Sequence, residues 1–162
     1  MESNVICRRR NSWRLLVATL LLAGAALQGA SIRTAAADEL DLESYRGQVV
    51  WVDFWASWCT PCRRSFPWMN DIMARYSDQG FVVIGVNVDR ERNLAEQFLQ
   101  DTPADFPIVY DPEGVLAKEF EVLGMPSSYL IDRNGNVISS HIGFRRDESE
   151  TYEAAIREAL AN

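Results

Sequence analysis

Residues 49–62 read VVWVDFWASWCTPC, and this stretch decides the fold. Its first seven residues are apolar or aromatic except Asp53, a continuous run that is typical of a strand buried on both faces. A helix is expected over about Pro61–Tyr76, because apolar residues recur along one face of that segment. The sequence therefore places Cys59 and Cys62 at the junction between a buried strand and the start of a helix.

The position of Cys59 favours a reactive thiolate. A sulfur at a helix start lies near unpaired backbone N–H groups and the positive end of the helix dipole. Thiols in such surroundings have pKa values of roughly 3.5 to 7.5, against about 8.5 for free cysteine. We therefore predict that Cys59 attacks disulfides and that Cys62, one turn further along, resolves the mixed disulfide that forms. Pro61 suits the first helical turn, where no backbone N–H is needed.

The rest of the chain predicts alternating strands and helices. A second buried strand is expected over residues 81–88, and Asp89 is expected to cap the helix that follows it, which carries Leu94, Phe98 and Leu99. The remaining expected elements are a strand at 108–110, a short helix ending near Phe120, strands at 127–131 and 137–144 joined by a turn at Asn134–Asn136, and a closing helix that carries Tyr152, Ile156 and Leu160 behind a capping box of Asp147 and Glu150. The order β-α-β-α-β-α-β-β-α, with parallel strands first and an antiparallel hairpin last, indicates an α/β fold.

Several motifs resemble the thioredoxin superfamily. Residues 52–62 resemble its active-site segment, Pro67 lies where thioredoxins carry a helix-kinking proline, and Gly124–Ser127 resembles the cis-proline loop. Between Asp89 and the proline of that loop lie 36 residues, more than the minimal fold has there, so the chain is similar to the exported TlpA/ResA-like branch. The resemblance covers about residues 38–160. It implies a thioredoxin-like fold, a central mixed sheet flanked by helices, with an extra strand and helix inserted before the cis-proline loop.

The resemblance also implies roles for residues around the dithiol. Asp53 matches the buried carboxylate of thioredoxins, and we expect burial to raise its pKa so that it exchanges a proton with Cys62. The alternative is a strand-edge carboxylate that faces solvent. The peptide bond before Pro126 would be cis, the backbone of Met125 would bind an extended substrate, and Trp58 would form an apolar wall beside Cys59. The substrate-binding residues expected in this way are Trp58, Thr60, Pro61, Met125 and Pro126.

The first 37 residues are typical of an export signal. A basic stretch precedes an apolar run at residues 15–27, and Ala35–Ala37 offers the small residues of a cleavage site. The alternatives are a membrane anchor retained at residues 15–30 and a buried core helix. We therefore expect a signal at 1–37, a thioredoxin-like domain at 38–162 and a periplasmic location. Loss of the signal would remove Cys7 and leave a single close pair of thiols, which favours redox chemistry.

The charge distribution limits the class of partner. Residues 1–37 hold five basic and one acidic side chain, whereas the remainder holds 11 basic and 22 acidic ones. The excess of acidic side chains after residue 37 argues against nucleic acid or an anionic membrane as the main partner. We expect a monomer that acts on disulfide-containing exported proteins and receives electrons from a membrane thiol-transfer protein. No cofactor and no metal are expected, because the single cysteine pair lacks a second pair and the one histidine is remote.

His141 and the tryptophans have simpler interpretations. His141 alternates with apolar neighbours in an expected strand, so we predict a surface residue rather than a catalytic base. Trp51, Trp55 and Trp68 are predicted to pack in or near the core.

Other functions remain as alternatives. Peroxiredoxins, which are thiol peroxidases, share the fold, but the Thr or Ser and the Pro that they place before the reactive cysteine would fall at Ala56 and Val52. A purely structural disulfide is disfavoured, because so short a loop removes little chain entropy. Cytochrome c maturation is disfavoured by Ser65, where the TlpA/ResA-like branch often carries Glu, and by the order Thr60-Pro61, the reverse of the usual Pro-Thr. Thr-Pro between the cysteines suggests a reductant, so we expect the pair to reduce disulfides of exported proteins.

Overall fold

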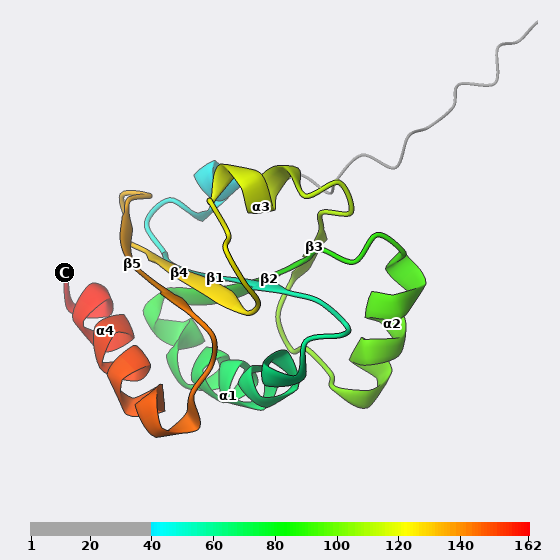
Figure 1. Ribbon diagram of the computed structural model, residues 1–162. Helices are drawn as coiled ribbons and strands as arrows, with labels where there is room; N and C mark the ends of the chain where they lie inside the picture. Colours follow the sequence, from blue (N-terminus) through cyan, green and yellow to red (C-terminus); the bar gives the residue numbers. More distant parts are fainter. Residues whose placement is uncertain (1–39) are drawn as a thin grey trace, which may run out of the picture. The chain divides into compact units, whose positions relative to one another are not determined.

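The computed structural model describes residues 40–162. The predicted signal or anchor lies outside the described residues. The predicted strands and helices all form, in the predicted order (Figure 1). The elements, with 3-10 helices written η, are η2 (Leu42–Tyr45), β1 (Val49–Trp55), α1 (Thr60–Tyr76), η3 (Ser77–Gln79), β2 (Phe81–Asn87), α2 (Arg92–Asp101), β3 (Ile108–Tyr110), α3 (Val115–Glu119), β4 (Ser127–Ile131), β5 (Val137–Ile142), η4 (Arg146–Glu148) and α4 (Ser149–Ala161). Among residues 40–162, no helix combines the length and the apolar character needed to cross a bilayer.

The strands form one mixed sheet in the order β3-β2-β1-β4-β5. β1 pairs in parallel with β2, and β2 with β3, whereas β4 runs antiparallel to both β1 and β5. In the register between β1 and β4, Asp53 lies opposite Ser128 and Phe54 opposite Ser127. The sheet confirms the predicted α/β class and its late hairpin.

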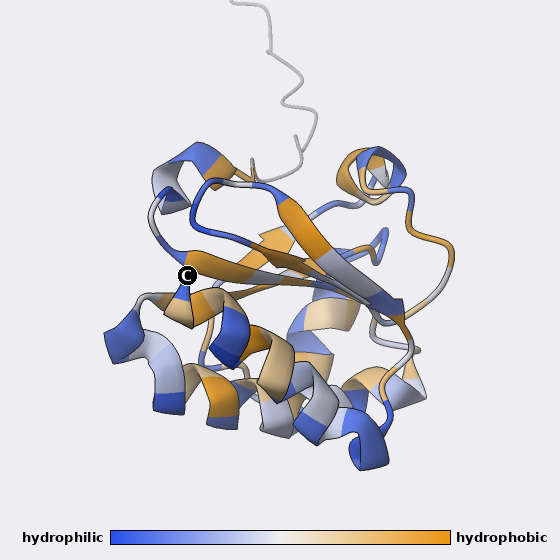
Figure 2. Ribbon diagram, turned by 90° about the vertical axis from the view of Figure 1, so that its left-hand side faces the viewer, coloured by the Kyte–Doolittle hydropathy of each residue, from blue (hydrophilic) through white to orange (hydrophobic). Residues whose placement is uncertain are grey.

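Helices cover both faces of the sheet, which is why β1 and β2 are buried along their whole length. Trp51 and Trp55 pack on one side in a core that also includes residues of α1, α2 and α4. Val52 and Phe54 point to the other side, where α3 and η2 pack. Figure 2 shows largely apolar strands in the middle of the domain, between helices that carry both polar and apolar residues. The predicted core positions of the tryptophans are confirmed, with Trp68 partly buried against the first of these cores.

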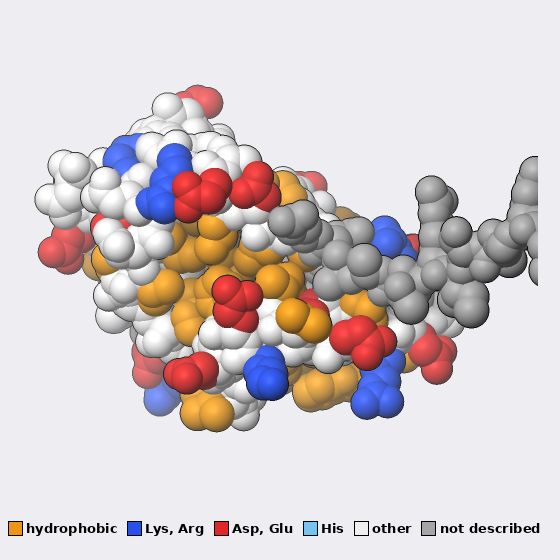
Figure 3. All heavy atoms as spheres, turned by 90° about the horizontal axis from the view of Figure 1, so that it is seen from above, with side chains coloured by type: hydrophobic (Ala, Val, Ile, Leu, Met, Phe, Trp, Pro, Cys, Tyr) orange, Lys and Arg blue, Asp and Glu red, His pale blue; other side chains and the backbone are white. Residues whose placement is uncertain are grey.

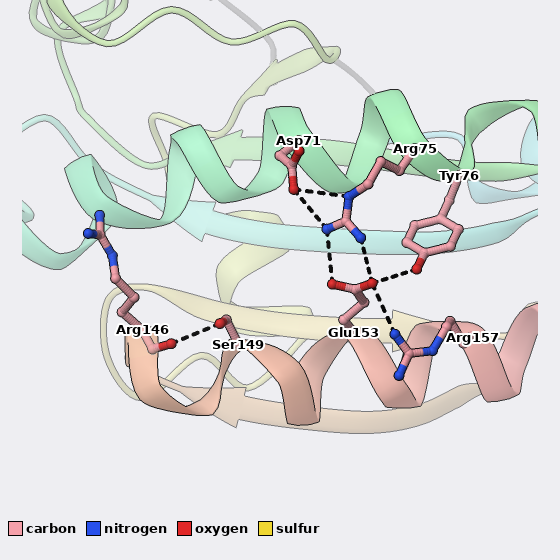
Figure 4. A network of polar contacts seen from close by, with 7 residues as sticks. All are labelled: Asp71, Arg75, Tyr76, Arg146, Ser149, Glu153 and Arg157. Carbon is pink, nitrogen blue, oxygen red and sulfur yellow. Dashed lines mark hydrogen bonds and ion pairs between the residues drawn. The ribbon is translucent and has the colours of Figure 1, made fainter.

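A network of charged groups joins α1 to α4 (Figure 4). The Glu153 carboxylate accepts hydrogen bonds from both terminal nitrogens of Arg75 and from the Tyr76 hydroxyl, and it pairs with Arg157 at 3.0 Å. Arg75 also pairs with Asp71 at 2.7 Å. The hydrogen bonds from Arg75 lower the pKa of Glu153 to about 2. The network fixes the second half of α1 against the closing helix.

Apolar side chains also gather on the face that carries α3. Figure 3 looks onto this face and shows them in its centre, with charged side chains around them. A pocket of about 290 Å³ there is lined by Phe120, Tyr129 and Val137, with Glu119 and Glu121 beside them. Neither cysteine lines this pocket, so it is separate from the dithiol.

Two predicted helix caps are wrong. α2 begins at Arg92 after Glu91, and the Asp89 carboxylate instead accepts hydrogen bonds from Ser57 and Asn87. Asp147 does not cap α4 either. A turn of 3-10 helix precedes α4, and the Asp147 carboxylate pairs with Arg145.

The late strand also differs from prediction. It ends at Ile142 rather than Phe144, because Gly143 takes a φ of 84°. His141 is not a plain surface residue. Its ring stacks on Tyr152 with 4.2 Å between the ring centres, and burial lowers its pKa. The prediction failed because the closing helix covers this face of β5.

Candidate active site

The end of β1 and the start of α1 position the cysteine pair. After Trp55 the chain makes a tight turn, which is closed by a hydrogen bond of 3.1 Å from the Cys59 N–H to the Ala56 carbonyl. Cys59 then caps the N-terminus of α1, and its Sγ accepts a hydrogen bond of 3.2 Å from the Cys62 N–H. Pro61 lies in the first turn of α1. The predicted place of the Cys59 sulfur at a helix start is confirmed.

The two cysteines form a disulfide and differ in exposure. Cys59 retains 3 % of its surface exposed, whereas Cys62 is fully buried. Trp58, immediately before the pair, is 69 % exposed. Thr60 is also exposed and Pro61 half-buried. A partner that approaches this end of the sheet therefore meets Trp58 and Cys59 before it meets Cys62.

A carboxyl group lies beneath α1 in the centre of the sheet. Asp53 is fully buried between Trp51 and Trp55, on the sheet face that these two side chains share with both cysteines. Burial raises the pKa of Asp53 to about 7, against the smaller opposing effect of a hydrogen bond from the Ser128 hydroxyl. Its second oxygen, Oδ2, makes no hydrogen bond within residues 40–162. The solvent-facing alternative for Asp53 is therefore wrong, and its raised pKa is confirmed.

The sequence did not identify Ser128 as the partner of Asp53. The two residues are 75 positions apart and meet only because β4 pairs with β1 in this register. Serine in an apolar strand was the one available signal, since a buried hydroxyl needs a hydrogen-bond partner.

The loop before β4 has the predicted cis peptide bond between Met125 and Pro126. Its conformation is held by a hydrogen bond of 2.7 Å from the Gly143 N–H to the Pro126 carbonyl. Another of the same length joins the Ser127 hydroxyl to the Gly124 carbonyl. Because Ser127 pairs with Phe54, this loop lies where β1 ends and the turn to Cys59 begins.

Two exposed apolar side chains accompany this loop. Leu123 is 86 % exposed and Ile142 is 62 % exposed. A Cβ on Gly124 would lie 3.3 Å from Ile142, so the end of β5 packs closely against the loop. Neither residue could be selected from the sequence, because an isolated exposed leucine or isoleucine has no local signature.

Residues 40–162 contain no group of three or more His, Cys, Asp or Glu side chains that could hold a metal ion. Ser65, at the position where the TlpA/ResA-like branch often carries Glu, is buried, and its hydroxyl donates to the Cys62 carbonyl at 3.1 Å.

Comparison with known proteins identifies a matching family and relatives of this chain. Residues 24–140 match the model of the AhpC/TSA family. The thiol-disulfide oxidoreductase ResA of Bacillus thuringiensis subsp. konkukian is 30 % identical over 110 residues, which are 68 % of this chain and 64 % of the relative. ResA of Geobacillus kaustophilus is 38 % identical over 96 residues, 59 % of this chain and 55 % of the relative. The aligned regions thus span less than two thirds of these curated relatives.

Solved structures show the same architecture. A putative thiol:disulfide interchange protein DsbE from Chlorobium tepidum superposes with a TM-score of 0.72 at 49 % identity, covering 74 % of this chain and 84 % of that one. StoA from Bacillus subtilis superposes with a TM-score of 0.59 at 27 % identity, covering 67 % and 82 %.

Proposed function

Because this chain belongs to the AhpC/TSA family, with a thioredoxin-like fold, we propose that it is a thiol–disulfide oxidoreductase that reduces disulfides of exported proteins. The observation that carries the proposal is the Cys59–Cys62 disulfide at the N-terminus of α1, with the Cys59 sulfur in the cap position. Relatives named as thiol-disulfide oxidoreductases support it.

The reaction begins from the reduced pair. The Cys59 thiolate, stabilised by the N–H groups at the start of α1, attacks one sulfur of a substrate disulfide and expels the other as a thiolate. Cys62 then loses its proton and attacks the Cys59 sulfur, which releases the second substrate thiol. Two electrons pass to the substrate, and the oxidised product is the disulfide between Cys59 and Cys62.

We propose that the Asp53 carboxylate accepts the proton that the Cys62 thiol loses. A carboxyl with a pKa of about 7 is present in both protonation states near neutral pH, so it can take up a proton and release it again. Its place on the sheet face beneath α1, among the core residues that include Cys62, supports this role.

The substrate would bind as an extended segment across the loop before β4. In this proposal the backbone of Met125 forms hydrogen bonds to the segment beside Pro126, and Trp58, Thr60 and Pro61 flank the attacking sulfur. The exposed Leu123 and Ile142 extend this surface with apolar area, which favours unfolded or partly folded proteins that display apolar side chains.

The cellular setting is part of the same proposal. Residues 1–37 direct export to the periplasm, either as a cleaved signal or as an anchor at 15–30, and residues 38–162 act there as a monomer. A membrane thiol-transfer protein returns the pair to its reduced state. No tightly bound cofactor takes part.

The site disfavours the two main alternatives. Val52, where a peroxiredoxin would carry proline, points into the core on the opposite face of the sheet from the cysteines, and Ala56 has no hydroxyl to offer a peroxide. Ser65 offers a hydroxyl where the TlpA/ResA-like branch often has the carboxylate of Glu, and this difference disfavours a specialised role in cytochrome c maturation.

A trapping experiment tests the assignment of the cysteines. The Cys62→Ser variant should accumulate mixed disulfides with exported proteins, because Cys59 can attack but nothing resolves the product. Captured partners are identified after separation without reductant. The control is the double variant Cys59→Ser, Cys62→Ser, and equal capture by both variants would refute the assigned nucleophile.

A further inference from the structure

The Asp89 carboxylate binds the turn that leads to Cys59. Asp89 follows β2 and is 5 % exposed. Its Oδ2 accepts a hydrogen bond of 2.8 Å from the Ser57 N–H, and its Oδ1 accepts one of 2.9 Å from the Ser57 hydroxyl. One carboxylate thus holds both the backbone and the side chain of the residue two positions before Cys59.

A second buried side chain fixes the orientation of this carboxylate. The Asn87 amide is fully buried and donates a hydrogen bond of 2.8 Å to Asp89 Oδ2, and its oxygen accepts one of 3.1 Å from the Asp89 N–H. Asn87 lies opposite Trp55 in the register of β1 and β2. The Val88 N–H donates to the Trp55 carbonyl at 3.0 Å, so the ends of both strands are joined here.

We propose that Asp89 is a positioning residue for Cys59. This inference rests on the proposed function. With both donors of Ser57 bound inward, the turn from Ala56 to Cys59 has one conformation. That conformation places the Cys59 sulfur at the start of α1 and directs Trp58 outward. Without the carboxylate, the turn would sample other conformations, because the exposed Trp58 does not hold it in place. The Cys59 sulfur would then spend less time at the N-terminus of α1.

The chain supplies a matched control at the end of β3. Asp111 is fully buried, and its carboxylate accepts hydrogen bonds of 2.7 Å and 2.9 Å from the N–H groups of Val115 and Ala117. It performs the same structural task for α3 that Asp89 performs for the turn. Replacing Asp111 should therefore weaken the fold without changing the reactivity of Cys59.

The test compares Asp89→Ala, Asp89→Asn and Asp111→Ala. For each variant we would measure the rate of insulin disulfide reduction and the pH dependence of Cys59 alkylation by iodoacetamide. Asp89→Ala should lower kcat/KM by about tenfold or more, since a displacement of about 1 Å can cost about a hundredfold. Its alkylation profile should move to higher pH. Asp89→Asn should restore most of the rate, because its amide oxygen can accept from Ser57 and Asn87 while its NH₂ donates to the Ser57 hydroxyl.

Unchanged kcat/KM and an unchanged alkylation profile in Asp89→Ala would overturn the proposal, as would the same loss in Asp111→Ala. If Asp89→Ala does not fold, Ser57→Ala removes the hydroxyl donor alone and should give a smaller loss of the same kind. Hydrogen exchange of the Ser57 amide in the oxidised protein is a readout independent of activity. It should accelerate in Asp89→Ala and not in Asp89→Asn, and equal exchange in all forms would overturn the proposal. An inert unmodified protein would refute the proposed function, while the exchange rates would still decide the role of Asp89.

Discussion

Replacing Asp53 with asparagine should remove a pH dependence of stability that the buried carboxyl creates. Burial raises the pKa of Asp53 from 3.8 to about 7, so the folded protein retains a proton that the unfolded chain releases. The contribution of Asp53 to stability is therefore largest below about pH 4 and falls as the pH rises to about 7, with little further loss above that. At about 1.4 kcal/mol for each unit of pKa difference, the loss is about 4 kcal/mol. Asparagine does not titrate, so Asp53→Asn lacks this loss.

The measurement is urea unfolding of the oxidised protein and of Asp53→Asn at a series of pH values between 4 and 8. The oxidised form is used because neither cysteine then titrates. The stability of Asp53→Asn relative to the unmodified protein should rise by about 4 kcal/mol across this range. The comparison cancels effects of the amide that do not depend on pH, including its altered hydrogen bond to Ser128. If the two stability curves run parallel, the carboxyl is ionised in the folded protein and the reasoning fails.

Two further substitutions test the polar contact beneath α1 and the charged network between α1 and α4. Ser128→Ala removes the hydrogen bond that lowers the pKa of Asp53, so the fall in stability should extend to higher pH than in the unmodified protein. An unchanged pH profile by urea unfolding would contradict this. Glu153→Gln should destabilise the oxidised protein by about 1–2 kcal/mol at pH 7, because the carboxylate loses its charged partner Arg75. Since the pKa of Glu153 is lowered to about 2, its stabilising effect is present above about pH 4.5 and disappears as the pH falls towards 2. The difference in stability between the unmodified protein and Glu153→Gln, measured by chemical denaturation, should be smaller at pH 3 than at pH 7. An equal difference at both pH values would contradict the assigned charge interaction.

Some of these polar groups could be anticipated and others could not. Asp53 was accessible to prediction because it interrupts a run of apolar residues in a strand that must be buried on both sides. Its partner Ser128 was not, because a serine in a strand has the same local pattern whichever residue faces it. Asp89 was misassigned for a similar reason. An aspartate shortly before a helix is typical of a cap, and nothing near it in sequence reveals that its carboxylate turns towards Ser57 instead.

His141 shows that the burial of a strand residue is also difficult to predict from the sequence. Alternation along a strand tells which residues share a face but not whether a helix covers that face. The closing helix brings Tyr152 onto the ring of His141, and this contact half-buries a residue expected at the surface.

The sequence by itself determined the order of the strands and helices and the position of the cysteine pair at a helix start, whereas the loop that carries Pro126 was expected from the resemblance to the thioredoxin superfamily. Hydrophobic periodicity, turn residues and helix-start chemistry act over a few neighbouring residues, so they can be recognised without the fold. The tertiary structure alone decided which distant polar groups meet, such as Ser57 with Asp89 and Asp53 with Ser128. These contacts depend on strand register and on how the connecting loops leave the sheet, and a shift of one residue along a strand would turn each side chain to the opposite face.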